Sequence, residues 1–294
     1  MMLNFKKIEL SDRSWIDERL KQSDFKSCDY SFVNNFIWSE PNGIEFAKFN
    51  DFYCLKNSVS YTYPAGSGDV KPVIEALIAD AAERGEKFVL RGMVKEKAEL
   101  LETLFPEKFD ISAPRAESDY IYLAEKLTTL SGRKLHGKRN HIARFKDNFD
   151  WVYEDITPDN IKDCIAMSRE WCELYREDKD DSLTDELCAV NKAFKYYFEL
   201  GLKGGLIRAD SKVVAFTIGE PLSSDTFVVH IEKAFSHIQG AYPIINQQFA
   251  EHNCSDFTYV NREEDMGEEG LRKAKLSYYP EIILDKYTAV LKND

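Results

Sequence analysis

The stretch that decides the fold is TFVVHIEK at residues 226–233, followed by GAY at 240–242 and YVNREED at 259–265. The first segment reads as a strand, the second as the start of a helix, and the third as the end of another strand. Most of the polar residues lie at strand ends. Ligands of open α/β sheets bind outside these ends, where a following helix offers free backbone N–H groups. The pattern indicates a group-transfer enzyme that handles an anionic donor.

Length and composition describe a folded globular protein. The chain has 294 residues, of which 44% are hydrophobic, which is enough for two modules with a core each. No apolar run approaches the roughly 20 residues that a membrane span needs, and the start, MMLNFKK, lacks a secretory apolar region. We therefore expect a cytoplasmic protein without a transmembrane segment.

Charge and metal-binding residues narrow the classes of function. The net charge of −12 argues against a general nucleic-acid coat. The six cysteines form no CxxC pair and the five histidines no ligand spacing on a helix, so we expect reduced thiols and no metal site. GxSxG, Walker, HExxH and complete dinucleotide motifs do not occur, which leaves hydrolase, nucleotide-hydrolysing and dehydrogenase functions little support.

The two halves of the chain share one order of elements. In the first half we expect strands at 44–49, 52–57, 59–63, 87–91 and 120–124, with helices at 11–22, 32–38, 70–84 and 95–105. In the second half we expect strands at 205–209, 213–220, 226–232, 257–260 and 282–290, with helices at 131–146, 158–175, 184–200, 241–252 and 268–275. This repeat predicts two α/β modules, residues 1–126 and 127–294, with a substrate cleft between them.

A basic segment covers residues 131–146. If Ser131 caps a helix, then Leu135, Ile142 and Phe145 share one apolar face. The polar residues of this helix are a possible tRNA-binding surface: Arg133, Lys134, Lys138, Arg139, Asn140 and Arg144. A solvated cationic face, or one balanced by the acidic residues at 177–186, explains the same pattern.

The strand at 226–233 carries candidate proton acceptors. Its alternation places Phe227, Val229 and Ile231 on one side and Val228, His230 and Glu232 on the other. Acylation of an amine needs an ammonium to be deprotonated first, and Glu232 or His230 suits that role. A purely structural contact of either side chain is the alternative.

The segments after this strand carry candidate binding residues. Gly240, with Ala241 and Tyr242, begins a helix and suits a close approach of backbone to a phosphate, although one glycine is a weak signal. Arg262, Arg272 and Lys275 suit a phosphate or carboxylate, while Glu264 and Asp265 suit an ammonium. The remaining acceptor-binding candidates are Lys233, Asn261 and Tyr278. An ion-pair lattice that fixes the last helix is the alternative.

The sequence resembles one known family. The segments VHIEKA at 229–234, GAY with Ile245-Asn246, NREEDMG at 261–267 and LRKAKLSY at 271–278, taken with LSGRKLHGKRNHI at 130–142, resemble the phosphatidylglycerol lysyltransferase C-terminal-like family. The resemblance implies two tandem GNAT acyltransferase modules, with mixed, mostly antiparallel sheets flanked by helices. It also implies kinship with the Fem-type aminoacyltransferases, which take an aminoacyl group from charged tRNA.

Three functions follow. We expect an acyltransferase that moves an aminoacyl group from aminoacyl-tRNA to an amine or hydroxyl acceptor, a small molecule or peptide, with no permanently bound cofactor. Gln239-Gly240-Ala241 is a reduced form of the acetyl-CoA loop, so an acetyl-CoA-dependent N-acetyltransferase is the second function. The third is a non-catalytic module that binds an anion, and a peripheral membrane contact stays open for all three.

Overall fold

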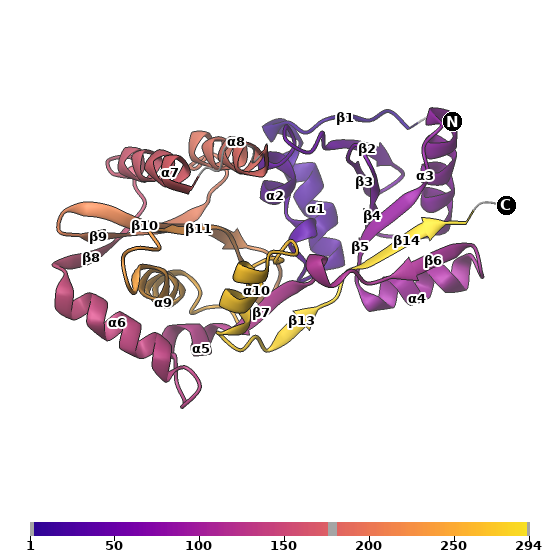
Figure 1. Cartoon of the computed structure of the whole chain (residues 1–294). Coiled ribbons are helices and arrows are strands. Elements are labelled where there is room, and N and C mark those ends of the chain that lie inside the picture. Colours follow the sequence, from indigo (N-terminus) through magenta and orange to yellow (C-terminus); the bar gives the residue numbers. More distant parts are fainter. Residues whose placement is uncertain (1–2, 176–180, 293–294) are drawn as a thin grey trace. The chain divides into compact units, whose positions relative to one another are not determined.

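The computed structural model describes residues 3–175 and 181–292, which form two compact units. The first unit comprises Met1–Asp119, Glu264–Glu269 and Ile283–Asp294. The second comprises Tyr120–Glu263 and Gly270–Ile282. Each unit contains one seven-stranded sheet of mixed strand directions, mostly antiparallel, with helices packed on it (Figure 1).

The first sheet has the strand order β1-β2-β3-β4-β5-β14-β6. Its strands are β1 (Lys6–Lys7), β2 (Glu45–Phe49), β3 (Phe52–Lys56), β4 (Tyr61–Gly66), β5 (Val89–Met93), β6 (Phe109–Ser112) and β14 (Tyr287–Leu291). Its helices are α1 (Arg13–Ser23), α2 (Phe32–Ile37), α3 (Lys71–Arg84) and α4 (Lys95–Leu104), with 3₁₀ turns at Leu10–Asp12, Cys28–Tyr30 and Arg115–Glu117. Helix α3 buries Val73, Ile74 and Leu77 at helical spacing and ends at Gly85 in the left-handed region.

The second sheet has the strand order β13-β7-β12-β11-β10-β9-β8. Its strands are β7 (Asp119–Leu123), β8 (Trp151–Asp155), β9 (Lys203–Ala209), β10 (Lys212–Pro221), β11 (Thr226–Ala234), β12 (Tyr259–Asn261) and β13 (Ile282–Leu284). Its helices are α5 (Ala124–Thr129), α6 (His136–Asn148), α7 (Ile161–Tyr175), α8 (Asp181–Lys195), α9 (Ala241–Asn253) and α10 (Glu269–Leu276). Helices α7 and α8 lie over one face of this sheet, and α9 and α6 lie on the other side (Figure 1).

The repeat predicted from the sequence is confirmed, and it extends to strand order. Read from β1 and from β8, the two sheets place equivalent strands at equivalent positions. In both, the fourth and fifth strands are parallel neighbours, β4 with β5 and β11 with β12. The sixth position is exchanged: β7 from the first half pairs with β12, whereas β14 from the end of the chain pairs with β5.

The exchange corrects the predicted closing strand at 282–290. This segment is two strands, β13 and β14, that belong to different sheets and are separated by Asp285 and Lys286. Hydrophobic alternation alone does not reveal such a break, because both pieces have strand-forming side chains. The strands β1, β6 and β8 were also missing from the prediction. The compact units differ from two consecutive pieces of chain, and a boundary at residues 126/127 between folding units stays a prediction.

A charged substitution in β14 tests the exchange. Ala289 is fully buried in the first sheet, opposite Leu90 and Ile111. We expect Ala289→Asp to lower the free energy of unfolding by about 3 kcal/mol or more, because it buries a carboxylate without a partner. Hydrogen exchange should lose protection first in β2 to β5.

The control is Lys292→Ala, a change just beyond β14 at a side chain that is half-exposed. It should leave both stability and exchange nearly unchanged. Loss of protection confined to β10, β11 and β12 would contradict the position of β14 in the first sheet.

Candidate active site

A β-bulge shapes the strand that carries the predicted proton acceptors. Ile218 pairs with Ile231 and Gly219 with Val229, so His230 is an extra residue in β11. The predicted alternation is wrong beyond this point, because the bulge places Val229 and Ile231 on opposite faces. A bulge depends on the register with a partner strand and has no signature in the strand's own periodicity.

Glu232 lies two residues beyond the bulge. Its carboxylate accepts hydrogen bonds from Arg262 at 2.7 Å and from Asn246 of α9 at 3.1 Å. The side chain is 9% exposed, and Thr217 lies opposite on β10. Asn246 Oδ1, Thr217 Oγ1 and Arg262 Nη1 are buried without a hydrogen-bond partner among the residues that the structure describes. Buried polar atoms of this kind are rare, and they mark this position as one built to hold a further polar group.

Two cations share an aromatic ring beside Glu232. The Arg262 guanidinium lies 4.9 Å from the centre of the Tyr278 ring, and Lys138 Nζ of α6 lies 4.0 Å from the same ring. Burial and the nearby Arg262 charge together lower the pKa of Lys138 to about 8. We call Glu232, Arg262, Asn246, Lys138 and Tyr278 the Glu232 site; all five belong to the second unit.

His230 has different partners. Its Nδ1 is 2.9 Å from Glu263, and its Nε2 is 3.3 Å from Glu220. Burial opposes protonation, but the hydrogen bonds and charges of the two carboxylates outweigh it and raise the pKa of His230 to about 9. The ring is an imidazolium at neutral pH and donates from both nitrogens, so this arrangement gives no support to His230 as a proton acceptor.

The end of β12 is held by its own neighbours. Glu263 adopts a left-handed backbone, with φ of 57°, and its N–H donates to Asn261 Oδ1 at 2.7 Å. Lys275 Nζ donates to the carbonyls of Arg262 and Glu263 at 2.6 and 3.1 Å. Asn261 and Lys275 thus fix the backbone that aims Arg262 and Glu263, and their predicted binding of acceptor and anion stays a prediction.

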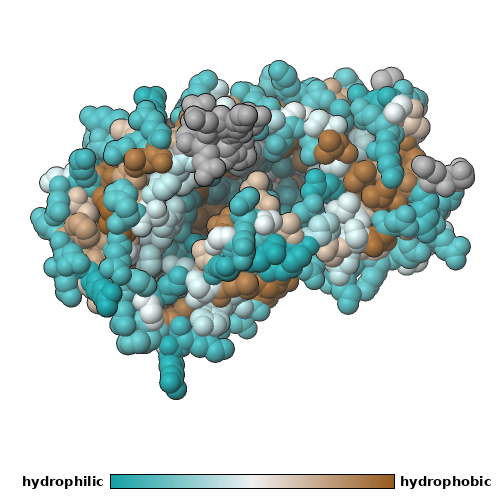
Figure 2. Space-filling view, viewed as in Figure 1, coloured by the Kyte–Doolittle hydropathy of each residue, from teal (hydrophilic) through white to brown (hydrophobic). Residues whose placement is uncertain are grey.

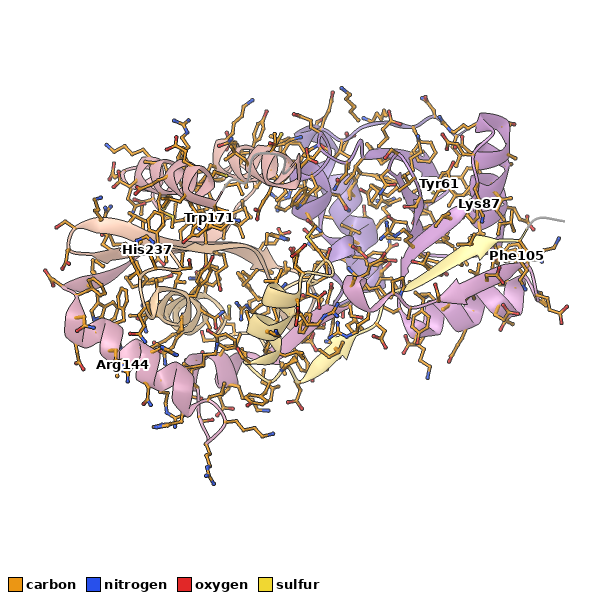
Figure 3. The ribbon with its side chains drawn as sticks, viewed as in Figure 1. Tyr61, Lys87, Phe105, Arg144, Trp171 and His237 are labelled. Atoms are coloured by element: carbon orange, nitrogen blue, oxygen red, sulfur yellow. The ribbon has the colours of Figure 1, made fainter. Side chains whose placement is uncertain are left out.

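Lys233 and Arg272 lie outside the Glu232 site. Lys233 Nζ is 2.6 Å from Glu186 of α8 and 3.7 Å from the ring centre of Trp171 of α7, which Figure 3 labels. It therefore contacts the helices on the other face of the sheet from Asn246 and α9. Arg272 is half-buried on α10. A cavity of about 470 Å³ in this unit is lined by α7, the β9–β10 hairpin and His237, and its lining includes none of the predicted site residues.

Gly240 serves the packing of α6. A Cβ at this position would lie 2.4 Å from the carbonyl oxygen of His141 and 2.9 Å from Phe145 Cβ, and its φ is +93°. This contact explains the glycine without a phosphate. Ala241 is buried and Tyr242 half-buried at the start of α9. Their predicted donor-binding roles stay predictions.

The residues of the basic segment at 131–146 differ in burial and in hydrogen bonding. Helix α6 begins at His136, and Ser131 does not cap it, because Leu135 occupies the N-cap. The predicted apolar face is confirmed, since Leu135, Ile142 and Phe145 are buried. Arg139 donates to the carbonyls of Leu130 and Gly132, and Asn140 contacts His136 at 3.2 Å.

The remaining cations of this segment differ in exposure. Arg133 and Arg144 are exposed, Arg144 on α6 (Figure 3), and Lys134 lies 5.0 Å from the Tyr279 ring centre. Lys138 alone among the six predicted residues joins the Glu232 site. Of the proposed acidic neighbour at 177–186, residues 177–180 and the side chains of 181–183 lie outside the described residues.

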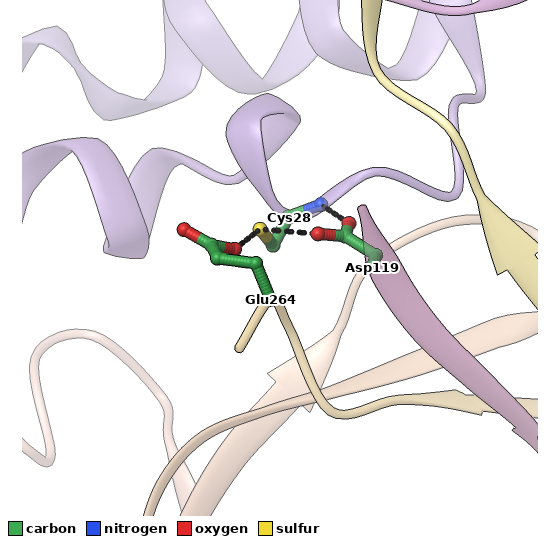
Figure 4. A group of neighbouring side chains, drawn as sticks. All are labelled: Cys28, Asp119 and Glu264. Carbon is green, nitrogen blue, oxygen red and sulfur yellow. Dashed lines mark hydrogen bonds between the residues drawn. The ribbon is translucent and has the colours of Figure 1, made fainter. Parts of the chain in front are cut away.

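In the first unit, Glu264 and Asp265 hold cations of the chain itself. Glu264 is 3.4 Å from Lys286 Nζ, which is also 3.0 Å from Asp119 and 3.3 Å from Asp29. The Cys28 thiol contacts Asp119 and Glu264 at 3.3 and 3.2 Å (Figure 4). We call Cys28, Asp29, Asp119, Glu264 and Lys286 the crossing cluster.

Asp265 is fully buried, 3.5 Å from Arg115. Lys286 thus pairs with Glu264, and Arg115 with Asp265. The sequence did not indicate these two cations, and the predicted binding of an acceptor by Glu264 and Asp265 stays a prediction. Cys28, Asp119 and Glu264 resemble a metal-ligand set, but the Lys286 ammonium supplies the positive charge beside them.

Comparisons with known proteins assign the chain to a family. The family model "Phosphatidylglycerol lysyltransferase, C-terminal" matches residues 20–290. The chain belongs to this family. A solved structure of a conserved protein of unknown function from Bacteroides thetaiotaomicron VPI-5482 is 42% identical, with a TM-score of 0.94 over 99% of this chain and 100% of that one.

More distant structures show the fold. The C-terminal domain of a putative lysylphosphatidylglycerol synthetase from Agrobacterium fabrum is 13% identical, with a TM-score of 0.68 over 96% of this chain and 92% of that one. FemX is 9% identical, with a TM-score of 0.56 over 98% of each chain. The predicted tandem GNAT fold is confirmed.

The surface gives no sign of a membrane span. No helix among residues 3–175 and 181–292 has the length and apolar character to cross a bilayer. The face in Figure 2 is mainly hydrophilic, with hydrophobic residues in small groups.

The pH dependence of stability tests the assignment of His230. The folded-state pKa, about 9, is above the ordinary value of 6.5, so the imidazolium stabilises the protein fully below pH 6.5. We expect this contribution, on the order of 3 kcal/mol, to be lost as the pH rises from 6.5 through 9. Urea unfolding between pH 6 and 9.5 measures it.

In His230→Gln this part of the pH dependence should disappear, together with part of the stability at pH 6.5. The control is His237→Gln, at an exposed histidine of the same unit. An unchanged pH profile in His230→Gln would show that His230 is neutral in the folded protein.

Proposed function

We propose that this protein is an acyltransferase that moves an aminoacyl group from aminoacyl-tRNA to an amine or hydroxyl acceptor. The observation that carries the proposal is the position of the Glu232–Arg262 pair. Strands β11 and β12 pair over residues 226–228 and 259–261, after which β12 ends and β11 continues to Ala234. The pair bridges this point, where α/β sheets bind their ligands.

The reaction uses the groups of the Glu232 site. The acceptor nitrogen or oxygen attacks the ester carbonyl, a new bond to the carbonyl carbon forms, and the bond to the ribose oxygen breaks. Glu232 accepts the acceptor's proton and passes it to the departing ribose oxygen, which leaves as a hydroxyl. Arg262 and Asn246 hold the Glu232 carboxylate in place, and a nearby cation offsets the charge that develops on the carbonyl oxygen.

Membership of the family supports the transfer chemistry. The family is named for a lysyltransferase, and FemX shares the tandem fold. The proposed acceptor is a hydroxyl or amine group of a small molecule, a peptide or a lipid.

Replacing the carboxylate tests the proposal. Full-length protein is mixed with aminoacyl-tRNA carrying a labelled amino acid and a panel of amine and hydroxyl acceptors, and transfer is counted. We expect Glu232→Gln to lower turnover by about 10²-fold or more, because the proton acceptor is lost. Circular dichroism must show that the variant is folded, since Arg262 loses its counter-charge.

The matched control is Glu154→Gln, which removes the carboxylate 2.7 Å from Arg208 elsewhere in the same unit. Its turnover should match the wild type. Equal turnover in Glu232→Gln would rule out the assigned role. Transfer from acetyl-CoA, and none from aminoacyl-tRNA, would show that the donor is an acyl-CoA. CoA should then also raise the melting temperature of the protein.

A further inference from the structure

The Glu232 site holds more positive than negative charge. Lys138 and Arg262 contribute two positive charges, and Glu232 contributes one negative charge. Arg262 uses Nη2 for Glu232 at 2.7 Å, while its Nη1 has no hydrogen-bond partner among the described residues. The two cations lie 4.0 and 4.9 Å from the same Tyr278 ring centre, and the Arg262 charge acts on Lys138.

Without a bound anion, the positive charge of Lys138 is unfavourable in this arrangement. Burial and the Arg262 charge both disfavour the Lys138 ammonium, while Glu232 is already engaged by Arg262 and Asn246. An anion between Lys138 Nζ and Arg262 Nη1 would satisfy the unpartnered N–H and offset the repulsion.

The surroundings favour phosphate. Lys138 is on α6, where residues 136–146 contain no acidic residue and Arg144 is exposed. A ligand with several negative charges can extend from Lys138 along this helix. Tyr278, whose ring both cations contact, is 4% exposed.

We infer that Lys138 and Arg262, stacked on Tyr278, form a subsite for a phosphate group of the donor substrate. The inference rests on the proposed function, because phosphate comes with either nucleotide-type donor. In aminoacyl-tRNA it is the phosphodiester next to the terminal adenosine, and in an acyl-CoA it is the pyrophosphate.

Anion binding at this subsite depends on pH. The charged and titratable groups that face Lys138 are Arg262 and Glu232 from the sheet and Tyr278 from the segment after α10. A bound anion raises the pKa of Lys138, so affinity is highest below pH 8 and falls as the pH rises through 8 and above.

Binding measurements on the full chain test the subsite without any need for turnover. Calorimetric titrations at pH 7 and pH 9.5 use three probes: inorganic phosphate, the dinucleotide cytidylyl-adenosine and CoA. We expect Lys138→Met to weaken binding of the preferred probe at least tenfold at pH 7, and the wild type to lose a similar factor between the two pH values. The thermal midpoint of Lys138→Met should equal or exceed that of the wild type, because an unfavourable buried charge is removed.

The matched control is Lys195→Met, since Lys195 at the end of α8 lies 4.9 Å from the Tyr196 ring centre and its side chain is exposed. Its affinities should be those of the wild type. Binding of the dinucleotide that depends on Lys138 supports the subsite with a tRNA donor, and Lys138-dependent binding of CoA supports it with an acyl-CoA donor.

Equal affinities of Lys138→Met and wild type for all three probes would overturn the subsite. That failure is distinct from failure of the proposed function. Lys138-dependent binding without transfer to any acceptor would support the subsite and contradict the proposed aminoacyl transfer.

Discussion

The buried ammonium of Lys286 is the interaction on which the first unit depends. Three separate segments build that unit, and each brings a charged group to the crossing cluster: Asp119 ends the first segment, Glu264 begins the second, and Lys286 lies near the start of the third. Lys286 is 3% exposed and Asp119 is fully buried. Burial opposes the charge of Lys286, but the carboxylates of Asp119 and Asp29 outweigh it and hold its pKa well above the usual value. Removal of one partner leaves a buried charge uncompensated, which costs far more than the pair itself contributes.

The three consecutive residues after β12 each form an ion pair. Arg262 pairs with Glu232, Glu263 with His230, and Glu264 with Lys286. The left-handed backbone of Glu263 is the turn that gives neighbouring side chains such different directions. A non-glycine residue in this conformation is strained, and it persists because Lys275 and Tyr120 hydrogen-bond the Glu263 carbonyl. The strand end is therefore fixed from several elements, and the position of Arg262 follows from it.

The sequence predicts local periodicity well and long-range pairing poorly. The apolar face of α6 and most helices follow from side-chain spacing, which is a property of the segment itself. The bulge at His230 and the exchange of β7 and β14 depend on partner strands far away in the chain. Lys138 had a usable signal, because it is three residues after Leu135 and four before Ile142, on the helix face that is buried. A lysine on an apolar face calls for a partner, but the sequence does not say that the Tyr278 ring supplies it.

The duplicated fold places different residues beside its two bulges. In the first sheet, Leu55 pairs with Thr62 and Tyr53 with Ala65, so β4 has a bulge at Tyr63 and Pro64. Counted from this bulge, Pro64 takes the place of His230 and Gly66 that of Glu232. A Cβ at Gly66 would lie 2.3 Å from the carbonyl oxygen of Asp51, so no carboxylate fits there. The bulge occurs in both sheets, whereas the histidine and the carboxylate beside it, His230 and Glu232, occur in the second sheet. The first unit thus keeps the fold, and the charges at its strand crossings serve to hold its three segments together.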